Sequence, residues 1–280
     1  MKTAQAYKKN IKSQISNLIH KSKKLDPGNH FGFRALVYHL VVDRPIENEW
    51  DEQTTPKDLF ESQMKYLCDN QYNVLSCTQA LRYLINRENI PPKTIAITFD
   101  DGYKDNYTNA LPVLKKYNFP ATLFLTADLL RDYSGRENFL SRSELLEMKD
   151  SGIIDFGCHG LTHRALTLLD EQRLNEEIRT ARQRLEEITG GKIELFAYPF
   201  GHSGSYNQDV VNKVRREGFL GAFTATFGLN HPKIDIFLLR RNRISWLDDL
   251  SEFEKHLSGA YDWYALWQSF SPKRYHFNGD

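Results

Sequence analysis

Cysteine and long apolar runs are scarce in this sequence. Its 280 residues include three cysteines, Cys68, Cys77 and Cys158, and no C-x-x-C pair. This low count favours a reducing compartment and speaks against a disulfide framework. No stretch approaches the roughly 20 apolar residues of a membrane span. No apolar segment follows the basic residues at the start, as it does in a secretory signal. We therefore expect a cytoplasmic protein.

An excess of charge of one sign is also lacking, as are the glycine-rich loops that bind phosphates. The 37 Lys and Arg residues nearly balance the 36 Asp and Glu residues, leaving a net charge of +1. No overall field therefore points to nucleic acid as a partner. The patterns G-x-G-x-x-G and G-x-x-x-x-G-K-[ST] do not occur, which argues against a dinucleotide or P-loop site. The length and the 40% hydrophobic content suit one large α/β domain or two small ones.

The first 25 residues are the exception to the charge balance, because they contain seven lysines and no acid. Apolar residues recur there at helical spacing: Tyr7, Ile11, Ile15, Leu18 and Ile19. This pattern predicts a basic amphipathic helix over residues 1–28, followed by a main domain over 29–280 with an aromatic C-terminal extension. Two interpretations of the helix stay open. It packs on the domain, or residues 1–25 bind an anionic membrane surface from the cytoplasmic side.

Short apolar runs alternate with helical patterns along most of the chain. The runs predict strands over residues 35–39, 73–76, 94–97, 121–125, 153–157, 195–198, 222–226 and 238–244. The patterns between them predict helices over residues 56–69, 78–85, 106–117, 141–150, 170–189 and 210–217. Such alternation indicates βαβ units and a parallel sheet. About seven units without a phosphate loop favour a barrel.

The most informative stretch is residues 98–103, which read Thr-Phe-Asp-Asp-Gly-Tyr. Asp100 and Asp101 follow a buried strand, and the carboxyl end of such a strand is where α/β barrels and open sheets place their chemistry. Two close carboxylates repel each other, so they coexist stably only with a cation or a shared proton. A simple turn is the alternative interpretation of Asp-Asp-Gly.

Two histidines come directly after the predicted strand 153–157. His159 and His163 are four residues apart, which on a helical turn puts both imidazoles on one face, close enough to share a metal ion. With Asp101 they complete a set of two His and one Asp, which is common for a catalytic divalent metal. Asp100 then remains to take a proton from a bound water. Structural histidines are the competing interpretation.

A third segment, residues 196–201, reads Phe-Ala-Tyr-Pro-Phe-Gly. A strand followed by a tight turn explains this segment adequately. The same turn could also form a groove wall at the mouth of the barrel, where a backbone N–H could donate to an oxyanion.

In this order and spacing, the segments resemble the polysaccharide deacetylases, the NodB-homology group known as carbohydrate esterase family 4. The resemblance covers about residues 33–245. It is strongest to the exopolysaccharide-synthesis branch, which carries a Tyr-His start and a Phe-Ala-Tyr-Pro-aromatic-Gly motif. The matching segments are residues 36–39, 98–103, 106–107, 111–112, 119–122, 159–163, 196–201, 218–219 and 235–244.

The resemblance implies a deformed (β/α)7 barrel of the NodB-homology type. It also implies a metal-dependent hydrolase that removes N-acetyl groups from a sugar in a surface polysaccharide, oligosaccharide or glycolipid precursor. Asp101, His159 and His163 would bind the metal, and Asp100 would be the general base. Zinc is the expected metal, with cobalt, nickel and manganese as alternatives. The expected substrate and oxyanion contacts are Tyr198, through its backbone N–H, together with Pro199 and Arg241.

The chain departs from the family pattern at three places. Gly160 stands where a Ser or Thr usually follows the first metal histidine, and a hydroxyl there would fix the loop. Ala197 replaces the common Arg of the third motif, so Arg240 or Arg241 would have to supply the positive charge that orients Asp100. The Leu-x-His motif, which supplies a general acid in many members, has no clear match.

The proton donor for the leaving amine therefore stays open. His39 is the preferred candidate, because it ends the first predicted strand at the same barrel mouth as Asp100. The alternatives are a positioning role for His39, proton donation by His202 or His231, and proton return by Asp100. Two other functions also stay open: a same-fold hydrolase of a cyclic amide, and a catalytically inactive sugar-binding module.

Overall fold

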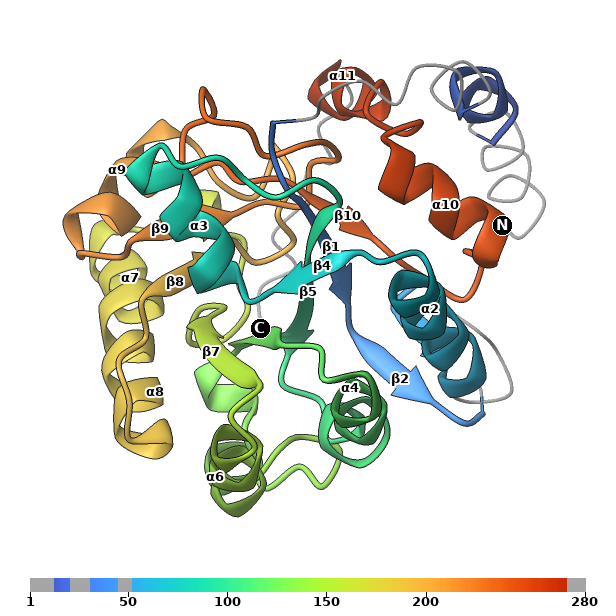
Figure 1. Ribbon diagram of the computed structural model, residues 1–280. Helices are drawn as coiled ribbons and strands as arrows, with labels where there is room; N and C mark the ends of the chain where they lie inside the picture. Colours follow the sequence, from blue (N-terminus) through green and yellow to red (C-terminus); the bar gives the residue numbers. More distant parts are fainter. Residues whose placement is uncertain (1–12, 21–30, 45–51, 271–280) are drawn as a thin grey trace, which may run out of the picture.

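A parallel β-sheet that is nearly closed into a barrel forms the centre of the molecule (Figure 1). The computed structural model describes residues 13–20, 31–44 and 52–270. The sheet order is β10-β1-β5-β6-β7-β8-β9, and β4 pairs with β5 beside this path. The strands are β1 (Arg34–Tyr38), β4 (Asn73–Leu75), β5 (Thr94–Asp101), β6 (Ala121–Leu125), β7 (Ile154–Cys158), β8 (Leu195–Ala197), β9 (Gly221–Phe223) and β10 (Arg241–Arg243).

The barrel closes between β9 and the segment that leads into β10. Phe223 and Leu239 form a parallel bridge there, and Thr224 N donates to Leu239 O at 2.7 Å. The shortest pairing along this path joins β7 and β8, which share the single register pair Cys158 and Phe196. The predicted deformed (β/α)7 barrel is confirmed, with seven strands along the path and β4 beside it.

Helices cover the outside of the sheet, and the expected helices are found with shifts of a few residues. They are α2 (Lys57–Asp69), α3 (Cys77–Asn86), α4 (Leu111–Tyr117), α5 (Arg131–Ser134), α6 (Arg142–Asp150), α7 (Glu171–Asn175), α8 (Ala181–Thr189), α9 (Gln208–Arg216), α10 (Leu250–Ser258) and α11 (Tyr264–Phe270). Two π-helical segments, η1 (Asn106–Ala110) and η4 (Glu176–Thr180), interrupt the predicted helices 106–117 and 170–189. Two 3-10 turns are η2 (Ala127–Leu129) and η3 (Leu166–Leu168). Ser141 and Glu144 form the capping box of α6.

Strands β2 (Leu40–Val42) and β3 (Thr54–Pro56) were not predicted; they form a separate two-stranded sheet after His39. Each has three residues, too few to show a period in the sequence. None of the helices in the described ranges has the length and apolar character that crossing a bilayer requires.

Strand β5 is buried along all eight of its residues. Its side chains contact apolar groups on both faces, as in other parallel strands that are covered on both sides. Phe99 packs against Tyr38 and Phe60, with ring centroids 5.6 and 5.8 Å away. This packing fixes the strand whose last two residues are Asp100 and Asp101.

Residues 13–20 form a helix that lies beside α10 and α11 in the upper right of Figure 1. The rest of the predicted helix 1–28 lies outside the described residues. The polar residue Ser16 of this helix is fully buried, whereas Ile15 and Leu18 are exposed. Two residues of the expected apolar stripe, Ile15 and Leu18, therefore face solvent, and a third, Ile19, is partly buried.

Candidate active site

The two carboxylates at the end of β5 are both buried, with exposed fractions of 3% for Asp100 and 4% for Asp101. Asp101 has a φ of +74° and Gly102 one of +89°, so the chain turns sharply as the strand ends. A non-glycine residue in this region costs of order 1–3 kcal/mol and is most often kept at functional sites. The sharp turn keeps both acids at the mouth of the barrel.

Asp100 is held by Arg241, which comes from β10. Arg241 Nη1 donates to Asp100 Oδ1 at 2.6 Å, and Nη2 donates to Oδ2 at 2.9 Å. Nε of the same guanidinium donates to Thr224 O at 3.0 Å, and the side chain is 1% exposed. Burial alone would raise the pKa of Asp100, but the charge of Arg241, with smaller effects of His159 and His39, lowers it to about 2. Asp100 is therefore ionised and fixed in orientation.

Arg241 does not have the substrate contact expected from the sequence. Its guanidinium is buried and engaged by Asp100 and Thr224, so it orients Asp100, which is the other role considered for it. The bidentate geometry suits arginine in particular, because its planar fork matches the two carboxylate oxygens.

Asp101 lacks the cation that Asp100 has. Its Oδ1 is buried and has no hydrogen-bond partner among the described residues. Burial first, and then the charge of Asp100, raise the pKa of Asp101 to about 7. A buried carboxylate oxygen without a partner is costly, and a bound cation would remove that cost.

His159 and His163 direct their Nε2 atoms toward this carboxylate. Asp101 Oδ1 lies 3.7 Å from His159 Nε2 and 3.4 Å from His163 Nε2. His159 Nδ1 lies 2.8 Å from Ala197 O, a contact that requires the proton on Nδ1 and leaves the Nε2 lone pair for a ligand. Burial lowers the pKa of His159 to about 3 and also lowers the pKa of His163. Both imidazoles are thus neutral, as metal ligands must be.

The donor set fits a divalent metal ion. Asp101, His159 and His163 each offer one ligand atom, and these atoms lie within 4.8 Å of one another. Two imidazoles and one carboxylate match the open three-ligand sites of catalytic zinc, in which the fourth position takes water or substrate. The unpaired Asp101 oxygen is the feature that most favours a cation here.

The loop that joins the two histidines is not the helical turn expected from their spacing. Residues 159–163 form an irregular bend, in which Gly160 has a φ of +85° and His163 one of +62°. The two rings approach to a centroid distance of 5.0 Å through this bend. The prediction that the rings come together was right, but the geometry behind it was wrong.

Glu177, from the π-helical segment η4, holds this loop from behind. Its Oε2 accepts hydrogen bonds from Leu161 N at 2.8 Å and from Thr162 N at 3.1 Å. The Thr162 hydroxyl also donates to Glu177. A Cβ on Gly160 would lie 2.9 Å from Glu177 Oε2. Glu177 therefore fixes this loop without a hydroxyl at position 160, where the positive φ and the nearby carboxylate both favour glycine.

Tyr198 does not offer the oxyanion donor that was expected. Its backbone N–H donates to Phe223 O at 3.0 Å within the pairing of β8 and β9. Its hydroxyl donates to Phe237 O at 3.0 Å, and its side chain is completely buried. Tyr198 is thus a core residue, and this prediction was wrong because strand pairing extends past the end of β8.

The turn after Tyr198 does reach the site. Pro199 packs against the histidine loop, with its Cγ 3.3 Å from the place of a Cβ on Gly160. The ring of Phe200 lies 4.6 Å from that of His163 and is 41% exposed. Phe200 also has a φ of +63°. Phe200 belongs to the motif at residues 196–201 that the sequence analysis identified, but the sequence does not show that its ring is exposed.

His39 follows β1, and its backbone O accepts a hydrogen bond of 2.8 Å from Asn106 Nδ2. Burial lowers the pKa of His39 to about 4, against the opposing charge of Asp100. The imidazole is therefore neutral near pH 7 and carries no proton that a general acid could readily give. Asp100 and Arg241 both affect the pKa of His39, so its side chain lies near the site, but the lowered pKa does not support the predicted role of general acid.

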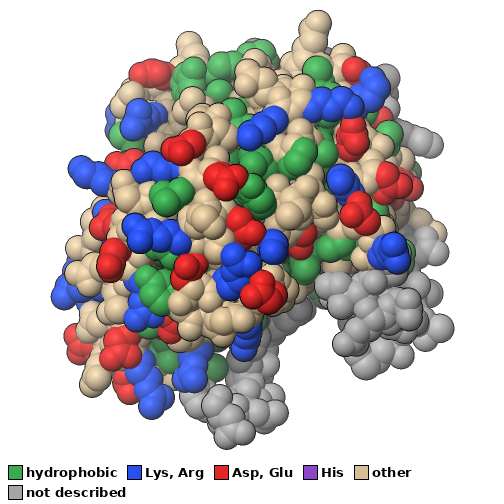
Figure 2. All heavy atoms as spheres, turned by 90° about the horizontal axis from the view of Figure 1, so that it is seen from below, with side chains coloured by type: hydrophobic (Ala, Val, Ile, Leu, Met, Phe, Trp, Pro, Cys, Tyr) green, Lys and Arg blue, Asp and Glu red, His purple; other side chains and the backbone are tan. Residues whose placement is uncertain are grey.

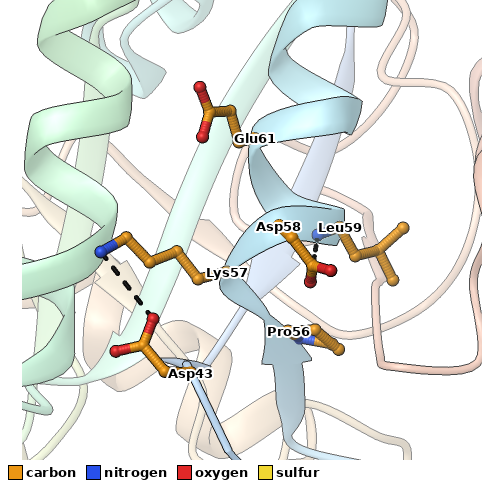
Figure 3. Close-up of a pocket in the computed structure, with 6 residues that line it drawn as sticks. All are labelled: Asp43, Pro56, Lys57, Asp58, Leu59 and Glu61. Atoms are coloured by element: carbon orange, nitrogen blue, oxygen red, sulfur yellow. Dashed lines mark hydrogen bonds and ion pairs between the residues drawn. The ribbon is translucent and has the colours of Figure 1, made fainter.

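The pocket in Figure 3 is a separate hollow of about 550 Å³ beside β3 and α2. Its lining residues are Asp43, Pro56, Lys57, Asp58, Leu59 and Glu61. Lys57 Nζ lies 3.8 Å from Asp43, and Glu61 accepts from Lys116 at 2.5 Å. Asp58 accepts from the backbone N–H of Leu59. None of the lining residues belongs to the donor set, so this pocket adds nothing to the chemistry of the site.

The comparison with protein families finds one match for this chain. The family model described as polysaccharide deacetylase matches residues 87–222. This span includes the carboxylates of β5, the histidine loop and Glu177. It does not include His39 or Arg241.

Curated relatives and solved structures extend the likeness over most of the chain. YxkH of Bacillus subtilis is 29% identical over 210 residues, which are 75% of this chain and 70% of that protein. A poly-beta-1,6-N-acetyl-D-glucosamine N-deacetylase of Staphylococcus epidermidis is 27% identical over 257 residues, 85% of this chain and 81% of the relative. The crystal structure of a polysaccharide deacetylase from Bacillus cereus shares 29% identity with a TM-score of 0.69, covering 81% of this chain and 69% of that one.

Loss of any one ligand should abolish tight metal binding. We expect Asp101→Ala, His159→Ala and His163→Ala each to lower the affinity for Zn²⁺ or Co²⁺ at least about 100-fold, because second-layer changes alone cost 10–100-fold. Isothermal titration of the metal-free protein measures this. His231→Ala, a loop histidine outside the donor set, is the control and should bind as wild type. Retention of one equivalent of metal by all three variants would refute the assignment.

Removal of Glu177 should weaken metal binding without touching a ligand. Glu177→Ala takes away the acceptor for the amides of Leu161 and Thr162, so His163 is no longer held in place. We expect a loss of about 10–100-fold in metal affinity. Glu176→Ala, an exposed neighbour on η4, should have no effect. Equal metal affinity in the two variants would show that Glu177 has no positioning role.

Proposed function

The chain belongs to the polysaccharide deacetylase family, and from this premise we propose that it removes N-acetyl groups from an N-acetylglucosamine polymer in a metal-dependent reaction. The observation that carries the proposal is the unequal pair at the end of β5. Asp100 is paired with Arg241, whereas Asp101 has a buried, unpartnered oxygen beside two neutral histidines. One carboxylate is thus suited to be a base, and the other to be a ligand.

Asp101, His159 and His163 would hold the metal through the three atoms described above. A divalent ion bound there supplies a Lewis acid for the amide carbonyl and lowers the pKa of a water. The protein's part is to keep the ligands deprotonated and oriented. Ala197 O fixes the tautomer of His159, and Glu177 fixes the loop that carries His163.

Asp100 takes the proton of the attacking water. Arg241 keeps its carboxylate ionised and prevents it from rotating away. His159 Nε2 lies 3.6 Å from Asp100 Oδ2, so the base is next to the ligand set. Asp100 then returns the proton to the leaving sugar nitrogen, because the lowered pKa of His39 leaves little of its imidazolium form near pH 7. His39 instead accepts or positions polar groups of the substrate.

The substrate side of the site suits an uncharged glycan. Phe200 presents a partly exposed ring beside His163, and an aromatic ring of this kind packs well against the apolar face of a sugar. On the one face of the molecule that Figure 2 shows, Lys and Arg side chains are mixed with Asp and Glu, and the whole sequence has a net charge of only +1. A surface of mixed charge does not favour a highly charged polymer. The Staphylococcus epidermidis relative is named for poly-beta-1,6-N-acetyl-D-glucosamine, and we propose the same class here.

The two other functions considered from the sequence lead to different results. A cyclic-amide hydrolase of the same fold would act on ureides or imides and not on N-acetylglucosamine oligomers. An inactive sugar-binding module would bind glycans without releasing acetate. The intact donor set and the arginine-held Asp100 support hydrolysis over simple binding.

The base assignment and the substrate class can be tested in one assay. We expect the metal-loaded wild type to release acetate from β-1,6-linked N-acetylglucosamine oligomers. Asp100→Asn should lose on the order of 10²–10⁴-fold in rate while it keeps the metal, since only the proton acceptor is removed. Asp209→Asn, an exposed aspartate on α9, is the matched control and should remain active.

Two outcomes would contradict the proposal. Acetate release by Asp100→Asn within a few-fold of wild type would remove Asp100 from the role of base. If the metal-loaded wild type hydrolyses ureides and leaves the oligomers intact, the substrate is a cyclic amide and not an N-acetylated sugar.

A further inference from the structure

Strand β10 places two arginines on the same side of the barrel wall. Arg241 and Arg243 are two residues apart on this strand, and alternate residues of a strand point to the same face. Arg241 points into the barrel, because its guanidinium is bonded to Asp100. Arg243 therefore points inward as well, and it lies nearer the carboxyl end of the strand, where the mouth of the barrel is.

The two arginines differ in how far they reach toward solvent. The side chain of Arg241 is 1% exposed, whereas that of Arg243 is 40% exposed. Strand β10 lies beside β1, where Arg243 is in register with Val37, two residues before His39 (Figure 1). Burial is the main cause of the lowered pKa of His39, and the charge of Arg243 lowers this pKa further. Arg243 is thus an accessible cation at the edge of the active site.

Glu52 holds Arg243 from the segment that leads into β3. Arg243 Nη2 donates to Glu52 Oε2, and the Glu52 side chain is 39% exposed. The backbone oxygens of residues 53 and 54 accept hydrogen bonds of 3.0 Å from Leu40 N and 2.7 Å from Trp246 N. Glu52 therefore lies between the segment that follows β1 and the segment that follows β10, both of which are at the mouth of the barrel.

The ion pair of Arg243 and Glu52 leaves hydrogen-bond donors for a ligand. Within the part of the chain that the structure describes, Nη2 is the guanidinium nitrogen of Arg243 that has a protein acceptor. The other N–H groups of the guanidinium can donate to a bound molecule. Because the two charges cancel, the pair suits the hydroxyl groups of an uncharged sugar better than it suits an acidic group.

We propose that Arg243 and Glu52 bind the sugar residue next to the one that loses its acetyl group, through hydrogen bonds to its hydroxyl groups. Arg243 is the residue that contacts this sugar, and Glu52 positions its guanidinium. Phe200 lies beside His163 and comes from the turn after β8, so the reacting sugar and its neighbour are held by different elements. The inference rests on the proposed function, because it takes an N-acetylglucosamine polymer as the substrate.

The competing interpretation is an ion pair that only ties the segment before β3 to the barrel. Exposed ion pairs contribute little to stability, so this interpretation predicts that loss of the pair changes neither binding nor catalysis. The substrate contact predicts weaker binding of long substrates with the catalytic groups intact. The two interpretations therefore differ in the KM for an oligomer.

Acetate release from β-1,6-linked N-acetylglucosamine oligomers by the metal-loaded full chain tests the proposal. We expect Arg243→Ala to raise KM about 10–100-fold, which is the effect of losing hydrogen bonds to a charged group, while kcat stays within a few-fold of wild type. The affinity for Zn²⁺ and the pH dependence of kcat should not change, because the metal ligands and the pair of Arg241 with Asp100 remain. Glu52→Gln should raise KM about two- to tenfold, because the guanidinium loses the charge that orients it.

Arg215→Ala is the matched control. Arg215 pairs with Asp235 at 2.9 Å, and their side chains are 49% and 36% exposed. This pair joins α9, on the outside of the barrel, to the loop before β10, so the variant should have the KM of wild type. Thermal unfolding shows whether each variant is folded. Glu52→Gln preserves the shape of the side chain and gives the same test if Arg243→Ala is unstable.

Three results with an active wild type would overturn the proposal. The first is the same KM for Arg243→Ala and Arg215→Ala, which would leave the pair without a substrate contact. The second is a fall in kcat or in Zn²⁺ affinity at unchanged KM, which would make the pair a support of the catalytic groups. The third is a lower KM for Glu52→Gln, which would mean that Arg243 binds an acidic group. A wild type that releases no acetate from the oligomers would instead defeat the proposed function, and this inference with it.

Discussion

The bidentate ion pair between Arg241 and Asp100 is the interaction on which the site depends. Two adjacent carboxylates end β5 in a buried environment, and without a counter-charge both would favour the protonated form. Arg241 pairs with one of them and leaves the other alone. The pKa values of the two acids are driven apart, to about 2 for Asp100 and about 7 for Asp101. The two neighbouring aspartates therefore differ in how readily they are protonated, because only one of them is paired with an arginine.

A second layer of contacts determines where the ligands lie. Ala197 O fixes the ring of His159, and Glu177 holds the loop that leads to His163. Gly160 and Glu177 depend on each other, because the carboxylate occupies the space that a side chain at position 160 would need. The positive φ of Asp101 and of His163 shows that the surrounding contacts overcome local preference at the site.

Sequence reasoning predicted the barrel and the two segments whose side chains meet at its mouth, because each has a local signal. Asp100 and Asp101 directly follow an apolar run, and His159 and His163 follow the next but one strand along the chain. It could not choose between Arg240 and Arg241, since Arg241 meets Asp100 across 141 positions of sequence. The role of Glu177 was also not predicted. In the sequence it is one acid among many on a charged helix, and its contact with the loop at 161–162 spans about 15 positions.

The errors have a common physical cause, which is competition for hydrogen bonds in three dimensions. The Tyr198 N–H was expected to be available, but β9 takes it through Phe223 O. For the N-terminal helix, packing on the domain and binding to a membrane were both left open, and in residues 13–20 a buried network with Lys255 holds the polar face against the domain. Neither partner can be read from spacing along one segment.

The most direct test of the account is an anomalous-difference map from a crystal soaked with Zn²⁺ or Co²⁺. The account predicts a single strong peak at about 2.0–2.2 Å from Asp101 Oδ1, His159 Nε2 and His163 Nε2, with Arg241 still bonded to both oxygens of Asp100. A peak that bridges Asp100 and Asp101, or a site in which Arg241 has left Asp100, would contradict the division of labour between the two carboxylates.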